Sequence, residues 1–128
     1  ISANTFVIVH KFSVRVGKGS DRITITGNNF TNSYMGDGLE KRPFDHERPM
    51  RRDEGSGIVL DNTSDVNITG NSFSGLSENA VEAHGDCRRI IISANLVTDI
   101  HRRSTVKNPD FNLGTAYATS IVRDNIVQ

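Results

Sequence analysis

The chain has 128 residues, enough for one domain with a modest core. Its 15 basic and 15 acidic residues give a formal net charge of zero, which argues against a nucleic-acid partner because phosphate contacts need a surplus of basic side chains. No apolar run approaches membrane-spanning length, so we expect no membrane partner. The 11 glycines and the abundant Asn, Ser and Thr are typical of short strands joined by tight turns.

One short motif recurs along the whole chain. It consists of an aliphatic residue, two variable residues, Asn, one variable residue, and then Phe or Val. Successive motif asparagines are 24, 43, 24 and 30 residues apart. They are Asn4, Asn28, Asn71, Asn95 and Asn125. Internal repetition on this scale indicates a solenoid.

Apolar residues also align upstream of each motif asparagine. Five residues before the Asn stand Ile23, Val66, Ile90 and, as a polar exception, Ser120. Thirteen or fourteen residues before it stand Val14, Ile58, Val81 and Phe111, followed two residues later by Val16, Leu60, Ala83 and Leu113. The local stretches alternate apolar and polar side chains, which is the period of a strand with one buried face. We therefore predict three short strands in each repeat of about 24 residues.

The pattern resembles the coils of the pectate-lyase-like superfamily, the right-handed parallel β-helices, over nearly the whole chain. The predicted fold is all-β: a right-handed parallel β-helix of about four to five coils, with residues 1–128 as a single domain or a fragment of a longer β-helix. Leucine-rich repeats and left-handed β-helices need consensus patterns that this sequence lacks. The resemblance implies that the motif asparagines form a ladder between the second and third strands, where Asn tolerates the left-handed backbone that the bend needs. It also implies an extracellular, cell-surface or periplasmic location.

The repeat is interrupted twice at the same position, the turn after the third strand. A charged insertion spans residues 35–54, and a shorter insertion spans residues 101–110. In the superfamily, loops from this turn wall a groove whose floor is the outward face of the first-strand sheet. We expect that floor to consist of two columns: Arg15, Val59, Glu82 and Asn112, and then Gly17, Asp61, His84 and Gly114.

The resemblance implies an acidic polysaccharide as the partner and, if the protein is an enzyme, lyase-type β-elimination. A lyase needs cationic groups to neutralise a uronate carboxylate and a base to remove the C5 proton. The candidate catalytic residues are Arg15, His84, His101 and Arg102. The candidate substrate-binding residues are His10, Lys11, Tyr34, Arg103 and Asn112. Asp61 and Glu82 are the candidate ligands for Ca²⁺, a cofactor that lyases of this fold often use.

Other chemistries stay open. Paired carboxylates would suit a glycoside hydrolase, although the three clustered aspartates that hydrolases of this scaffold use are absent from the floor. The histidines suit a transition metal but lack close ligand spacing. Cys87, beside Arg88 and Arg89, is either an activated thiolate or a small turn residue.

A non-enzymatic role is the rival class of function. The chain would then be a structural or adhesive segment of a larger surface, secreted or tail-fibre protein. Both ends of the chain fall in mid-coil, and a bare solenoid end exposes unpaired strand edges and apolar core. We therefore expect self-association or adjoining polypeptide at the coil ends.

Overall fold

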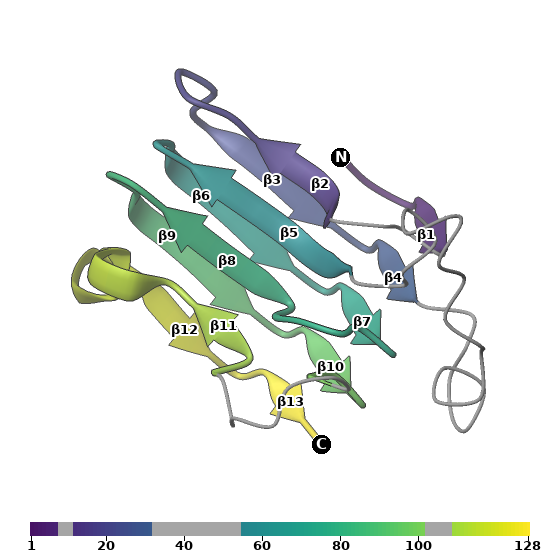
Figure 1. Ribbon diagram of the computed structural model, residues 1–128. Coiled ribbons are helices and arrows are strands. Elements are labelled where there is room, and N and C mark those ends of the chain that lie inside the picture. The colour runs from purple at the N-terminus through teal and green to yellow at the C-terminus, as the bar shows by residue number, and fades with distance from the viewer. Residues whose placement is uncertain (8–11, 32–54, 102–108) are drawn as a thin grey trace, which may run out of the picture.

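The computed structural model describes residues 1–7, 12–31, 55–101 and 109–128, which form three parallel sheets stacked as the coils of a solenoid (Figure 1). This is the right-handed parallel β-helix that the repeat predicts. All of the predicted insertion at 35–54, and residues 102–108 of the shorter one, lie outside the described ranges.

Each full coil contributes one strand to each sheet. The first-strand sheet has the order β11-β8-β5-β2, with β2 Phe12–Val16, β5 Ser56–Asp61, β8 Val81–His84 and β11 Phe111–Asn112. The second-strand sheet has the order β12-β9-β6-β3, with β3 Ile23–Thr26, β6 Ser64–Thr69, β9 Arg88–Ser93 and β12 Ile121–Arg123. The third-strand sheet has the order β1-β4-β7-β10-β13, with β1 Thr5–Val7, β4 Asn29–Thr31, β7 Ser72–Ser74, β10 Leu96–Thr98 and β13 Ile126–Val127.

Inward side chains form columns that run through the stack. The predicted column of Val14, Ile58, Val81 and Phe111 is confirmed, because each residue is the register partner of the next in parallel pairing. In the third-strand sheet, Phe6, Phe30 and Phe73 stack ring on ring, with centroids 4.9 and 4.7 Å apart. Burial of these columns is the main stabilising term for a chain of this size.

The predicted asparagine ladder is confirmed at all five positions. In each rung, the backbone N–H and the Nδ2 amide of one motif asparagine donate to Oδ1 of the asparagine in the next coil, at 2.9 to 3.1 Å. The inner rungs Asn28, Asn71 and Asn95 are at most 2% exposed. The side chains thus satisfy turn backbone that the core would otherwise leave unpaired.

The left-handed backbone of this turn lies one residue earlier than the sequence analysis placed it. The residue before each motif asparagine has φ between 54° and 64°, and these residues are Ala3, Gly27, Gly70, Ala94 and Asp124. The asparagines themselves have no positive φ. Asparagine is therefore selected here for its amide and not for its tolerance of left-handed φ.

Ser120, the polar exception among the apolar columns, marks a change in the last coil. The 3-10 helix η2 (Gly114–Thr119) precedes it and buries Ala116. The Ser120 hydroxyl donates to the Ala116 carbonyl at 2.7 Å and accepts from the Ile90 backbone N–H at 3.1 Å. The Ser120 hydroxyl thus accepts the hydrogen bond that a backbone carbonyl would accept in a regular strand ladder. No helix within the described residues is long and apolar enough to cross a membrane.

Candidate functional site

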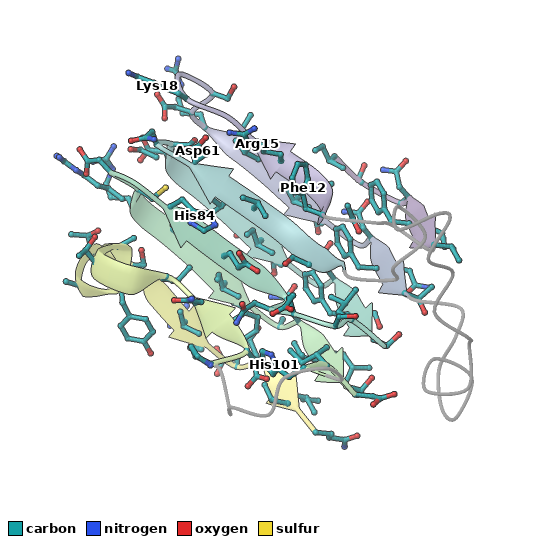
Figure 2. The ribbon with its side chains drawn as sticks, in the orientation of Figure 1. Phe12, Arg15, Lys18, Asp61, His84 and His101 are labelled. Atoms are coloured by element: carbon teal, nitrogen blue, oxygen red, sulfur yellow. The ribbon has the colours of Figure 1, made fainter. Side chains whose placement is uncertain are left out.

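Parallel register assembles the predicted floor on the outward face of the first-strand sheet. Arg15 pairs with Val59, Val59 with Glu82, and Glu82 with Asn112, which confirms the first column. Asp61 pairs with His84, which confirms the centre of the second. Figure 2 shows Arg15, Asp61 and His84 on this one side of the stack.

A pocket of about 320 Å³ occupies this face. We call it the floor pocket. Its walls come from three of the four strands of the first-strand sheet, β2, β5 and β8. The lining residues are Phe12, Arg15, Ser56, Val59, Asp61, Glu82 and His84. The sequence-predicted residues Arg15, Asp61, Glu82 and His84 are thus brought together.

Arg15 and Asp61 form an ion pair across adjacent coils. Asn62 donates from Nδ2 to the other carboxylate oxygen of Asp61 at 2.7 Å. The bond from Arg15, and secondarily the one from Asn62, hold the pKa of Asp61 below its usual range, because both stabilise the charged form. The Arg15 side chain is 53% exposed, so this cation borders both pocket and solvent.

Glu82 contacts two other polar side chains of the pocket, Ser56 and His84. Its Oε1 accepts from the Ser56 hydroxyl at 2.5 Å, and its Oε2 lies 3.2 Å from Nε2 of His84. The Glu82 side chain is 18% exposed, whereas that of His84 is 59% exposed. A fixed carboxylate therefore orients an accessible imidazole, which is the arrangement of a base and its positioning group.

These pairings make the floor pocket nearly charge-balanced. Arg15 carries one positive charge, and Asp61 and Glu82 carry two negative charges. The sum is −1 with His84 neutral and zero with His84 protonated. A surplus of cations, as an acidic polymer would favour, is not present among the described lining residues.

The sequence analysis did not predict Phe12 and Ser56 as residues of this face. Strand alternation places them on the buried side, together with Val14 and Ile58. The backbone N–H groups of Gly57 and Ile58 both donate to the next coil, to the carbonyls of Asn79 and Ala80 at 3.1 and 2.9 Å. In a regular parallel strand, only alternate residues donate to the same neighbour. This local irregularity breaks the alternation, as bulges beside functional sites often do.

Gly57 allows this irregularity to fit. An added Cβ there would lie 2.4 Å from the Ala80 carbonyl oxygen and 2.8 Å from the Phe73 ring. Gly57 was the one sign of this irregularity in the sequence, since an isolated glycine in a strand pattern suggests a bulge or a close backbone approach.

His101 does not join the floor pocket. In Figure 2 it lies toward the C-terminal end of the stack, well apart from Arg15, Asp61 and His84. Its Nε2 lies 3.4 Å from Oδ1 of Asp110, and its side chain is 13% exposed. The two histidines within the described residues, His84 and His101, are therefore separate. Asn112 is in register with Glu82 but does not line the pocket.

The other predicted site residues lie outside the described ranges: His10, Lys11, Tyr34, Arg102 and Arg103. Their roles remain predictions. Across the described residues, no group of three or more His, Cys, Asp and Glu side chains is arranged to hold a metal ion. Ca²⁺ binding by Asp61 and Glu82 therefore also remains a prediction. Cys87 is 3% exposed, and its thiol donates to the His84 carbonyl at 3.2 Å, which fits a small turn residue.

Comparisons of the chain with protein families, with curated proteins and with solved structures each return no match. The chain is a parallel β-helix with a paired-charge pocket on the outward face of its first-strand sheet.

Proposed function

We propose that the protein binds a polysaccharide along the outward face of the first-strand sheet, with the floor pocket as the central sugar subsite. The observation that carries this proposal is the composition of the pocket: apolar surface from Phe12 and Val59 lies beside the polar groups of Arg15, Asp61, Glu82, His84 and Ser56. Ligand sites in general combine apolar walls with a few convergent polar groups. A sugar ring offers the matching features, since its C–H faces are apolar and its hydroxyls both donate and accept.

Lyase-type elimination is the reaction that the polar groups support best, and it would place the chain with the pectate-lyase-like enzymes. His84, oriented by Glu82, would remove the C5 proton of a uronate. The electrons of the C5–H bond form the C4–C5 double bond, the C4–O bond breaks, and the leaving oxygen takes a proton from water. Arg15 would meet the uronate carboxylate, which must then compete with Asp61 for the guanidinium.

The charge balance of the floor pocket separates two substrate classes. A neutral glycan can bind without disturbing the Arg15–Asp61 pair, whereas a uronate polymer must either break that pair or use further cations. Lys11, Arg102 and Arg103 are the candidates for that second role, and they lie outside the described residues. Affinity for a uronate polymer that falls steeply with salt would favour the second class.

The test is titration of the chain with polygalacturonate and with a neutral glucan, with and without Ca²⁺, followed by ultraviolet detection of unsaturated uronate. We expect His84→Ala to abolish elimination while binding persists, and Arg15→Ala to weaken binding. Thr24→Ala, on the exposed face of β3, is the matched control and should change neither. Binding without unsaturated product would leave a non-catalytic carbohydrate module. Absence of binding to either polymer by the unaltered chain would overturn the proposal.

A structural or adhesive role is the alternative. It is favoured by the mutual pairing of the pocket charges, since compensated ion pairs also occur on inert solvated surfaces. Under that alternative, Arg15→Ala and Thr24→Ala would leave binding to every glycan unchanged.

A further inference from the structure

We propose that Ser56 is a positioning residue of the floor pocket: through Glu82 it keeps the proton of the neutral His84 ring on Nε2, which leaves Nδ1 as the basic atom. This inference deepens the proposed function, and the catalytic use of Nδ1 rests on that function. Its support is a chain of two hydrogen bonds that begins at a buried hydroxyl and ends at an exposed imidazole.

The chain of hydrogen bonds runs from the interior of the coil toward solvent. Ser56 is 5% exposed, and its hydroxyl donates to Oε1 of Glu82 at 2.5 Å. The Glu82 side chain is 18% exposed, and its Oε2 lies 3.2 Å from Nε2 of His84, whose side chain is 59% exposed. The buried hydroxyl therefore holds one carboxylate oxygen in place, and this gives the other oxygen a fixed direction toward the imidazole.

The acceptor character of Glu82 decides which nitrogen of His84 carries the proton. An ionised carboxylate has only acceptors, so it bonds to Nε2 only when Nε2 carries hydrogen. In a neutral imidazole the other nitrogen, Nδ1, then has the free lone pair. We assign removal of the C5 proton to this lone pair. The proton forms an N–H bond at Nδ1, and Glu82 balances the charge of the imidazolium that results.

Asp61 is a second carboxylate beside His84, since the two residues are register partners in adjacent coils. Both of its oxygens already accept hydrogen bonds, one from Arg15 and the other from Asn62. Within the described residues, the ring of His84 is hydrogen-bonded to Glu82 and not to Asp61. Glu82 is therefore the carboxylate that orients the imidazole.

A nucleophilic role for Ser56 does not fit these contacts. A serine nucleophile needs its hydroxyl bonded to the base that takes its proton. Here the hydroxyl bonds to Glu82, and the imidazole lies on the other oxygen of that carboxylate. The order of the three groups places Ser56 behind the carboxylate, which is the place of a positioning residue.

The irregular backbone at Gly57 explains how a serine in a strand reaches Glu82. Glu82 is the register partner of Val59, so regular alternation back from Val59 would turn Ser56 toward the core. Ser56 lines the floor pocket instead. The close approach of Gly57 to the next coil thus brings to the site a hydroxyl that a regular strand would direct inward.

The primary test is the ¹⁵N spectrum of the His84 ring in the free chain above about pH 8, where an ordinary imidazole is neutral. The unprotonated ring nitrogen resonates far downfield of the protonated one, so the spectrum reports the tautomer. We expect a larger share of the Nε2–H tautomer than in the same chain unfolded in urea. Equal tautomer mixtures in the folded and unfolded chains would overturn the proposal.

Variants of Ser56 test its part in this arrangement. Ser56→Ala should return the tautomer mixture toward that of the unfolded chain, and Ser56→Thr, which keeps the hydroxyl, should restore the Nε2–H form. If Ser56→Ala does not fold, Ser56→Cys takes its place, because a thiol is a weak donor. Ser74→Ala is the matched control: it removes a strand hydroxyl that also bonds to the adjacent coil, to Thr31 at 3.1 Å, and should leave the tautomer unchanged. An unchanged tautomer in folded Ser56→Ala would remove the positioning role.

Turnover of polygalacturonate separates this proposal from the proposed function. Ser56→Ala should lower kcat about tenfold, a part of the roughly 10²–10⁴-fold that a positioned base contributes, with KM unchanged. A raised KM with unchanged kcat would make Ser56 a binding residue and contradict the assignment. If the unaltered chain forms no unsaturated product, elimination at this site is excluded, whereas the ¹⁵N spectrum of the free chain still decides whether Ser56 and Glu82 set the tautomer.

Discussion

The asparagine ladder and the floor pocket both contain polar side chains that meet across adjacent coils, but they differ in repetition, in burial and in the partners of each side chain. The ladder uses the same residue in every rung, buries the inner rungs and bonds each amide to the next. The floor pocket uses a different residue in each coil, leaves His84 and Arg15 more than half exposed and pairs them with unlike partners. In a solenoid, repetition marks the groups that maintain the stack, and departure from repetition marks the groups available for a ligand.

The largest expected effect on stability lies at Gly57, next to the floor-pocket residue Ser56. Gly57→Ala places a Cβ within 2.4 Å of the Ala80 carbonyl oxygen, a backbone atom that cannot move without shifting the next coil. We expect destabilisation of about 3 kcal/mol, the upper end of overpacking costs. Chemical denaturation measures this loss. Gly17→Ala is the control, because a Cβ there meets nothing within 4 Å. Equal stability of the two variants would contradict the close approach.

Asn71→Ala should have the next largest effect. Its amide bonds to the Ile25 and Thr69 carbonyls and to Asn95, and its Oδ1 accepts from Asn28. Removal leaves these buried groups unsatisfied, at a cost of about 1–3 kcal/mol. The exposed first rung provides the comparison: Asn4→Ala should cost less than half as much. If thermal melts of both variants match the unaltered chain, the ladder does not stabilise the fold.

Arg15→Ala should lower the free energy of unfolding far less than Asn71→Ala does, because the Arg15 side chain of the ion pair is 53% exposed and solvent screens such a pair. The comparison of ladder and pocket therefore predicts a separation of effects. Ladder substitutions lower stability, whereas the pocket substitution changes ligand affinity with little change in stability. A destabilisation by Arg15→Ala as large as that of Asn71→Ala would remove the distinction.

The fold could be predicted because its signals repeat. Five asparagines and the apolar columns that precede them specify strand direction, register and which side chains face inward, and register in turn aligns Arg15, Glu82, Asp61 and His84. What could not be predicted occurs once. The irregular backbone at Ser56 and Gly57, and the replacement of a strand bond by the Ser120 hydroxyl, depend on local geometry that no second copy in the chain reveals. The pairing of the charged side chains could not be predicted from the sequence either. Alignment places charged residues in one column, but it does not show that Arg15 binds Asp61 or that His84 faces Glu82.

The pH dependence of Asp61 is the smallest expected effect and the most specific to one pair. Its pKa lies below the ordinary value of 3.8 because Arg15, and then Asn62, bond to the charged carboxylate. The folded protein therefore holds this proton less tightly than the unfolded chain does. The pair stabilises the fold fully above about pH 4–5, and that contribution is lost as the pH falls through the lowered pKa.

Arg15→Ala should return the Asp61 pKa toward 3.8, as followed by the carboxyl ¹³C shift in an NMR titration. Asp65 provides an internal control: Arg89 lowers its pKa in the same way, and that value should not move. An Asp61 titration that is identical with and without Arg15 would show that the pair does not persist in solution, and the guanidinium would then be free for a ligand carboxylate without competition.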